Sequence, residues 1–147
     1  MTDPLLTADD LAQIRIEPCK ALPPFGPVRL VAPPHVQAVR DWLGEPTWTK
    51  VIVIVSGLER GEGASLSDSG HTLPHEWPEP DEPARPGVEV FTPLDRVFVE
   101  PVAFRRLLGR YLATICDAVN AQGHAWGKRP DWSRVEQQRD VLAEEAR

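Results

Sequence analysis

The chain has 147 residues, of which 41% are hydrophobic and 26% are charged, and its formal net charge is −6. These values are typical of a globular protein, and the length predicts one domain over residues 1–147. The longest apolar run, Val51–Val55, is far shorter than the roughly 20 residues of a membrane-spanning helix. The acidic start of the chain also lacks the features of a signal peptide. Composition therefore excludes an integral membrane protein and favours a cytoplasmic location.

The first third of the chain carries signals for two helices and two extended segments. Thr7 is suited to cap a short helix, after which residues 15–18 are expected to be extended. Val28–Val31 has the pattern of a short strand. Pro33-Pro34 then opens a helix whose apolar residues recur at helical spacing and which ends at Gly44.

Residues 48–55 include five consecutive β-branched residues, Val51–Val55. A continuous apolar run of this type is typical of a central strand that is buried on both faces. We therefore expect a strand here. Together with the preceding strand and helix it would form one right-handed crossover, or the two strands would pair antiparallel elsewhere.

Residues 56–87 are rich in Gly, Ser and Pro and show no apolar periodicity, which predicts a long loop. This segment carries seven acidic residues against Arg60 and Arg85. Within it, residues 74–86 alternate proline with acid, a pattern that favours the extended polyproline conformation. Loops of this length are usually functional or disordered, so the acidic segment is a candidate for function.

Two strands and a long helix are predicted after the loop. Val88–Phe91 and Arg96–Val99 are separated by four residues, which is compatible with a hairpin. The strongest amphipathic pattern of the chain follows and predicts a helix over residues 101–121 that Gly123 terminates. Cys116 lies on the apolar face of this helix, where a free thiol acts as a small hydrophobe.

The end of the chain predicts one more helix. It is expected to begin near Ser133, because Ser133 and Glu136 match a capping box. Its apolar face is thin, so the helix would pack on one side only or leave a face for a partner. The expected fold is therefore α+β: a small mixed or antiparallel sheet of about four strands packed against the helix at 101–121.

Metal and catalytic motifs find little support in the sequence. His71 and His75 are the only close histidine pair, but Pro74 between them prevents their sharing a regular helix face. We expect two solvated loop histidines and no metal or other cofactor. The glycines after residue 56 lack the Lys-Ser/Thr of a phosphate loop, and Ser56 lacks the flanking glycines of a nucleophile elbow.

A basic aromatic surface is the second candidate site. Three arginines share a broad helix face, and Trp126 and Trp132 follow them with further basic residues; the basic members are Arg105, Arg106, Arg110, Lys128 and Arg129. Such a set could bind nucleic acid. The overall acidity of the chain argues against that partner, and a solvated helix face is the plainer interpretation.

Our first functional hypothesis is a protein-binding domain without catalytic activity. An acidic segment can steer association with a basic partner and occupy its active site, as acidic inhibitors and immunity-type proteins of bacteria do. Trp77 would be the aromatic anchor of this contact, because Trp is enriched at binding hot spots. The candidate partner-binding residues are Glu76, Trp77, Glu79, Asp81 and Glu82.

Two alternatives stay open at this point. The chain could be a structural subunit of a larger assembly, such as a phage-like or secretion machine, with its partners being like subunits. It could also be a metal-binding or hydrolytic enzyme that uses His71 and His75. The sequence predicts no membrane partner.

Overall fold

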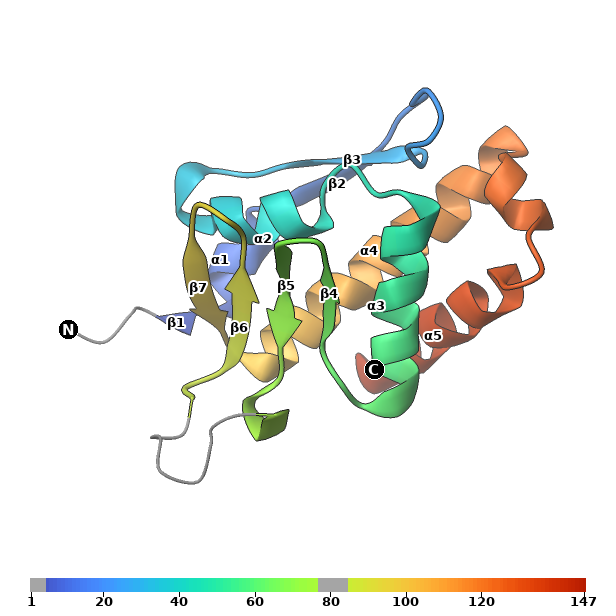
Figure 1. The fold of residues 1–147 in the computed structure, drawn as a ribbon. Helices are drawn as coiled ribbons and strands as arrows, with labels where there is room; N and C mark the ends of the chain where they lie inside the picture. The colour runs from blue at the N-terminus through green and yellow to red at the C-terminus, as the bar shows by residue number, and fades with distance from the viewer. Residues whose placement is uncertain (1–4, 77–84) are drawn as a thin grey trace.

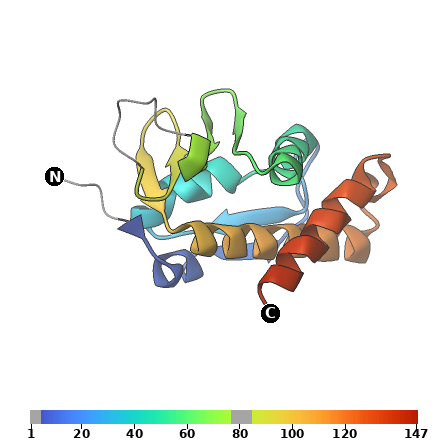
Figure 2. The ribbon, with the colours of Figure 1, turned by 90° about the horizontal axis from the view of Figure 1, so that it is seen from below.

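A 22-residue helix, α4 (Pro101–Gln122), runs through the middle of the domain (Figure 1). In this computed structural model, which describes residues 5–76 and 85–147, α4 lies beneath a five-stranded sheet, and α1 (Ala8–Ala12) and α5 (Trp132–Glu145) lie on its other side (Figure 2). The α+β class is confirmed. No helix within the described ranges has both the length and the apolar character needed to cross a bilayer.

The sequence prediction for α4 is confirmed, and its ends have clear causes. Pro101 occupies the first helical turn, where a missing N–H costs nothing. Gly123 adopts the left-handed conformation, with φ of 59°, that closes the helix. Between these ends the apolar residues form one continuous buried face: Ala103, Phe104, Leu107, Leu108, Tyr111, Leu112, Ile115, Cys116, Ala118 and Val119.

The larger sheet has the strand order β1-β7-β6-β5-β4. β6 (Val88–Phe91) and β7 (Arg96–Val99) form the expected antiparallel hairpin, in which Val90 faces Val97. At one edge, β1 (Leu5–Leu6) pairs parallel with β7. The sheet therefore joins the start of the described chain to its middle.

A second, two-stranded sheet covers α4 from another direction. β2 (Arg15–Pro18) and β3 (Val28–Val31) pair antiparallel and contact α4, so both extended segments are confirmed. A short 3₁₀ turn, η1 (Pro34–Val36), then leads into α2 (Gln37–Leu43), as the proline pair predicts. α2 packs against β6 and β7 and so covers part of the larger sheet.

The expected strand at 48–55 is wrong: these residues belong to helix α3 (Trp48–Arg60). Thr47 caps the helix by accepting a hydrogen bond from the Lys50 N–H at 3.2 Å, and Gly61 ends it with φ of 67°. Three of the β-branched residues, Val51, Ile54 and Val55, have helical spacing and are buried. Packing of this face has outweighed the local β-propensity of the run. The right-handed crossover expected over residues 28–55 is therefore absent, and of its two expected strands only β3 forms, paired antiparallel with β2.

The expected loop at 56–87 is also wrong for its described part. Helix α3 continues to Arg60, and β4 (Ala64–Leu66) and β5 (Ser69–Thr72) then form a hairpin that extends the sheet. A 3₁₀ turn, η2 (Pro74–Glu76), follows. The strands were missed because they are short and contain Ser, Gly and His, so neighbouring strands rather than local apolar pattern define them. Residues 77–84 lie outside the described residues.

The last helix, α5, begins at Trp132 after a 3₁₀ turn, η3 (Ala125–Lys128). Its N-cap position is Asp131, so the capping box expected at Ser133 is not the start of the helix. Arg134 fastens α5 to α3 through Glu59, at 2.5 Å, and through the Ser56 hydroxyl at 3.0 Å. α5 thus packs across both α3 and α4.

We predict that Tyr111→Phe lowers the free energy of unfolding by about 1 to 2 kcal/mol. The Tyr111 hydroxyl is fully buried and donates to the Leu43 carbonyl at 2.8 Å, where α2 ends and its carbonyls have no helical partner. Chemical denaturation would measure the loss. Thr114→Ala is the control, because it removes a hydrogen bond on the outer side of the same helix and should change stability by less than about 0.5 kcal/mol.

Candidate functional site

The acidic candidate residues are only partly within the described chain. Trp77, Glu79, Asp81 and Glu82 lie outside the described residues. Glu76 is exposed, but its Oε1 accepts hydrogen bonds from the backbone N–H groups of Gly63 and Leu73, each at 2.8 Å. The Glu76 carboxylate therefore links η2 to Gly63, the residue before β4, through these hydrogen bonds.

His71 is a buried residue of β5, so the expectation of two solvated histidines holds only for the exposed His75. The imidazole of His71 is 4% exposed and lies against the ring of Phe104, with 4.7 Å between ring centroids. Its Nδ1 accepts a hydrogen bond from the Trp42 indole N–H at 3.0 Å. The described residues contain no group of three or more His, Cys, Asp or Glu side chains that could hold a metal ion.

The hydrogen bond from Trp42 sets the chemical form of His71. A nitrogen that accepts cannot carry a proton, so the neutral ring must carry its proton on Nε2. Burial lowers the pKa of this imidazole to about 4, because the charged form would lose its hydration. At neutral pH His71 is thus an uncharged donor, unsuited to act as a general base at its Nδ1.

The aromatic members of the basic candidate surface are buried. Trp126 is 4% and Trp132 is 6% exposed, and both rings pack against Trp48 at centroid distances of 5.5 and 6.3 Å. Arg129 covers the same cluster, with its guanidinium 5.2 Å from the Trp48 ring. These tryptophans hold η3 and α5 against α3 and are not platforms on which bases could stack.

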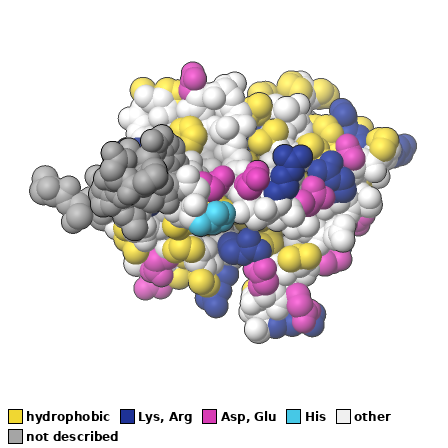
Figure 3. All heavy atoms as spheres, turned by 60° about the horizontal axis from the view of Figure 1, so that its bottom comes forward, with side chains coloured by type: hydrophobic (Ala, Val, Ile, Leu, Met, Phe, Trp, Pro, Cys, Tyr) yellow, Lys and Arg dark blue, Asp and Glu magenta, His cyan; other side chains and the backbone are white. Residues whose placement is uncertain are grey.

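Charges of both signs are mixed on the face of the molecule that Figure 3 shows. Among the three arginines of α4, Arg105 forms a bidentate pair with Glu145 of α5, with N–O distances of 2.8 and 2.6 Å. Arg110 donates to the carbonyls of Leu11 and Ile14 at 3.0 and 3.2 Å. The three side chains therefore do not form the single basic face that their spacing suggests.

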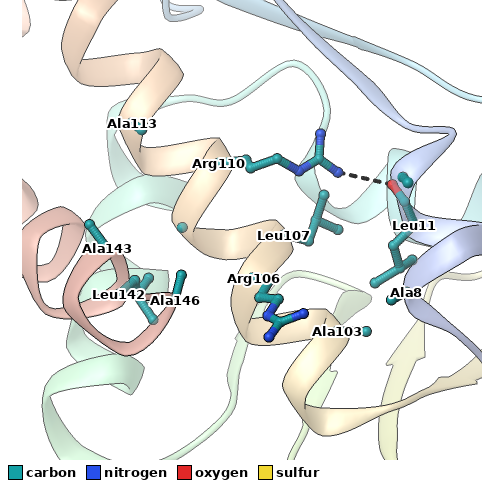
Figure 4. Close-up of a pocket in the computed structure, with 12 residues that line it drawn as sticks. Ala8, Leu11, Ala103, Arg106, Leu107, Arg110, Ala113, Leu142, Ala143 and Ala146 are labelled. Atoms are coloured by element: carbon teal, nitrogen blue, oxygen red, sulfur yellow. Dashed lines mark hydrogen bonds between the residues drawn. The ribbon is translucent and has the colours of Figure 1, made fainter.

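A groove with a volume of about 670 Å³ lies between α1, α4 and α5. Arg110 reaches from α4 toward α1 on one side, and residues of α5 form the other side (Figure 4). Most of the lining is apolar and small. The lining residues are Ala8, Leu11, Ala12, Ala103, Arg106, Leu107, Gly109, Arg110, Ala113, Leu142, Ala143 and Ala146.

The groove continues past Arg106 toward the start of α4. A second hollow of about 180 Å³ shares Arg106, Leu142 and Ala146 with the first and adds Val102 and the Arg105–Glu145 ion pair. Val102 is 63% exposed, which is uncommon for a valine on a helix that is otherwise buried on its apolar side. From Val102 to Ala113 the combined groove follows about 17 Å of the α4 axis.

Arg106 and Arg110 form no ion pair with a carboxylate of the described residues, although Glu145, which pairs with Arg105, lines the smaller hollow beside Arg106. Arg106 is exposed and forms no ion pair or hydrogen bond with any described residue. Arg110 has only backbone carbonyls as partners, and burial lowers its pKa although the guanidinium stays charged. Like charges four residues apart on a helix are unfavourable, so an acidic ligand would relieve this pair.

No family model, no curated protein and no solved structure matches this chain. Within the described residues, the groove and the buried histidine are two candidate sites. Sequence reasoning placed Arg106 and Arg110 on one helix but missed the walls from α1 and α5. The available signal was the thin apolar face of the last helix, with Ala143 and Ala146 beside it.

Acidification from pH 7 to pH 5 is expected to lower the free energy of unfolding by about 2 kcal/mol through His71 alone. The unfolded chain binds a proton on this side chain below its ordinary pKa of 6.5, whereas the folded chain does not until about pH 4. Above about pH 6.5 His71 therefore does not reduce the free energy of unfolding. As the pH falls from about 6.5 to about 4, proton binding by the unfolded chain lowers that free energy progressively. Denaturant unfolding of wild type and His71→Asn at both pH values measures it, because asparagine does not titrate. An equal loss in both proteins would contradict the assignment.

Proposed function

We propose that this protein is a protein-binding domain whose groove between α1, α4 and α5 accepts an amphipathic helix carrying acidic side chains from another protein. The observation that carries the proposal is the combination of an apolar floor with Arg106 and Arg110, neither of which has a carboxylate partner in the described chain. An apolar groove beside two such cations is complementary to a ligand that has carboxylates flanking an apolar stripe.

The shape of the groove supports a helix as the ligand. Its floor consists mainly of alanine, glycine and leucine, and small side chains let a second backbone approach closely. The 17 Å that the groove follows along α4 corresponds to about three turns of a bound helix. Helices bound in grooves place anchors at spacings of three and four residues, which would set apolar side chains over Leu107 and Leu142.

The charges of the chain make this recognition local. The whole chain carries a formal charge of −6, so at long range it repels an acidic partner. Only at short range do Arg106 and Arg110 attract it. A ligand therefore needs apolar contact and charge together, which gives selectivity against acidic surfaces that lack the apolar stripe.

The docking of residues 76–82 on a basic partner stays a prediction, since four of its five candidate residues lie outside the described residues. It shares with the groove proposal the class of protein-binding domain but requires a partner of opposite charge. The two can therefore be separated by the charge of the ligand that binds.

The test uses two helical peptides of equal length that share one leucine and alanine stripe, flanked by glutamate in one and by lysine in the other. We expect the glutamate peptide to bind at least about tenfold more tightly, although the chain is acidic overall, because it pairs with the two arginines. Isothermal titration calorimetry measures both affinities. Tighter binding of the lysine peptide would contradict the proposal.

Three variants locate the binding surface. Arg106→Glu is expected to weaken the glutamate peptide about tenfold, and Ala113→Trp to weaken both peptides by filling the groove. Arg60→Glu is the matched control: it makes the same charge change at an exposed position of α3 that does not line the groove. An equal loss in Arg60→Glu would show that net charge, and not the groove, sets the affinity.

A further inference from the structure

A second, smaller pocket lies between α3, the β5–η2 segment and the first turns of α4. Its volume is about 170 Å³. The walls include Leu58 from α3, Leu73, and Phe104 and Leu108 from α4, and His71 is the buried polar side chain among the lining residues. It shares no lining residue with the 670 Å³ hollow of the groove and only Arg105 with the smaller one.

One nitrogen of the buried imidazole has no hydrogen-bond partner among residues 5–76 and 85–147. Nδ1 of His71 is occupied by the Trp42 indole N–H, and Nε2 donates to no described residue. Every fully enclosed side-chain nitrogen or oxygen of the described residues does have a partner. Nε2 is therefore not fully enclosed, and the pocket is the hollow that His71 lines. The pocket that His71 lines is mostly apolar, so an acceptor bound in it would be the ligand for this N–H.

We propose that this pocket binds a small, uncharged, largely apolar molecule that carries one hydrogen-bond acceptor, with a carbonyl oxygen placed on Nε2–H of His71. The donor is held in position from behind by Trp42 and from the side by the Phe104 ring, so it is oriented before a ligand arrives. The pocket volume of about 170 Å³ is close to that of engineered apolar cavities of about 150 Å³ that bind benzene. The ligand therefore has about six to eight non-hydrogen atoms.

The surrounding charges favour an uncharged ligand. Glu62, His75 and Arg105 also line the pocket. Arg105 already forms the bidentate pair with Glu145, so its charge is balanced within the chain. A carboxylate ligand would lose its hydration against the apolar walls and gain only one hydrogen bond from a neutral ring. A ketone loses far less and gains the same bond.

The experiment compares cyclohexanone with methylenecyclohexane, which has the same shape but carries no hydrogen-bond acceptor. Each is titrated into the full chain while the His71 Nε2–H and Trp42 Nε1–H resonances are followed by NMR. We expect saturable shifts of both resonances, and a ketone affinity about 3- to 10-fold higher than that of the hydrocarbon, as one net hydrogen bond provides. Equal affinities, or no saturable shift with either molecule, would overturn the proposal.

Two variants make the result specific to this pocket. In His71→Met the thioether sulfur is a weak acceptor that can still face the Trp42 N–H, but the side chain has no donor, so the preference for the ketone should disappear. Leu73→Phe leaves His71 in place and fills the pocket, so both molecules should bind at least about tenfold more weakly. If His71→Met does not fold, the ketone preference of wild type and the weaker binding of both molecules to Leu73→Phe decide the outcome. Unchanged affinities in Leu73→Phe would overturn the proposal.

Discussion

The apolar face of α4 is the constraint on which the rest of the structure depends. Ten of its residues are buried, and they contact elements from both ends of the chain. α1, β2 and β3 come from before residue 32, whereas η3 and α5 follow residue 124. Because one helix supplies a surface to all of these segments, its position determines where the groove walls of α1 and α5 stand (Figure 2).

Buried polar groups then fix the register of the elements packed around α4. The Tyr111 hydroxyl joins α4 to the end of α2, and the Trp42 indole joins α2 to β5. Each hydrogen bond satisfies a group whose burial without a partner would cost about 1 to 3 kcal/mol. Since Trp42 and Leu43 are neighbours in α2, the two bonds link α4, α2 and β5 into one connected unit. The same connection holds His71, which lines the small pocket, with its Nδ1 already occupied.

The two candidate sites use different physics, although both are built on α4. The groove offers exposed charge beside small apolar side chains, and its walls come from three helices. The pocket offers one neutral donor in a space of about 170 Å³. A macromolecular partner suits the first, because its length and open sides allow a helix to lie in it, whereas only a small molecule fits the second. The proposals are therefore independent, and failure of one leaves the other standing.

Elements whose local pattern and ends agree could be predicted from the order of residues alone. The period of α4, with Pro101 and Gly123 at its ends, and the alternation across β6 and β7 made these elements predictable. The helical state of Val51–Val55, the hairpin after residue 63 and the burial of His71 follow instead from packing in the folded chain. The reason is physical: periodicity and caps depend on residues within one or two turns. The state of a β-branched run, a short polar strand or a lone histidine depends on partners far along the chain.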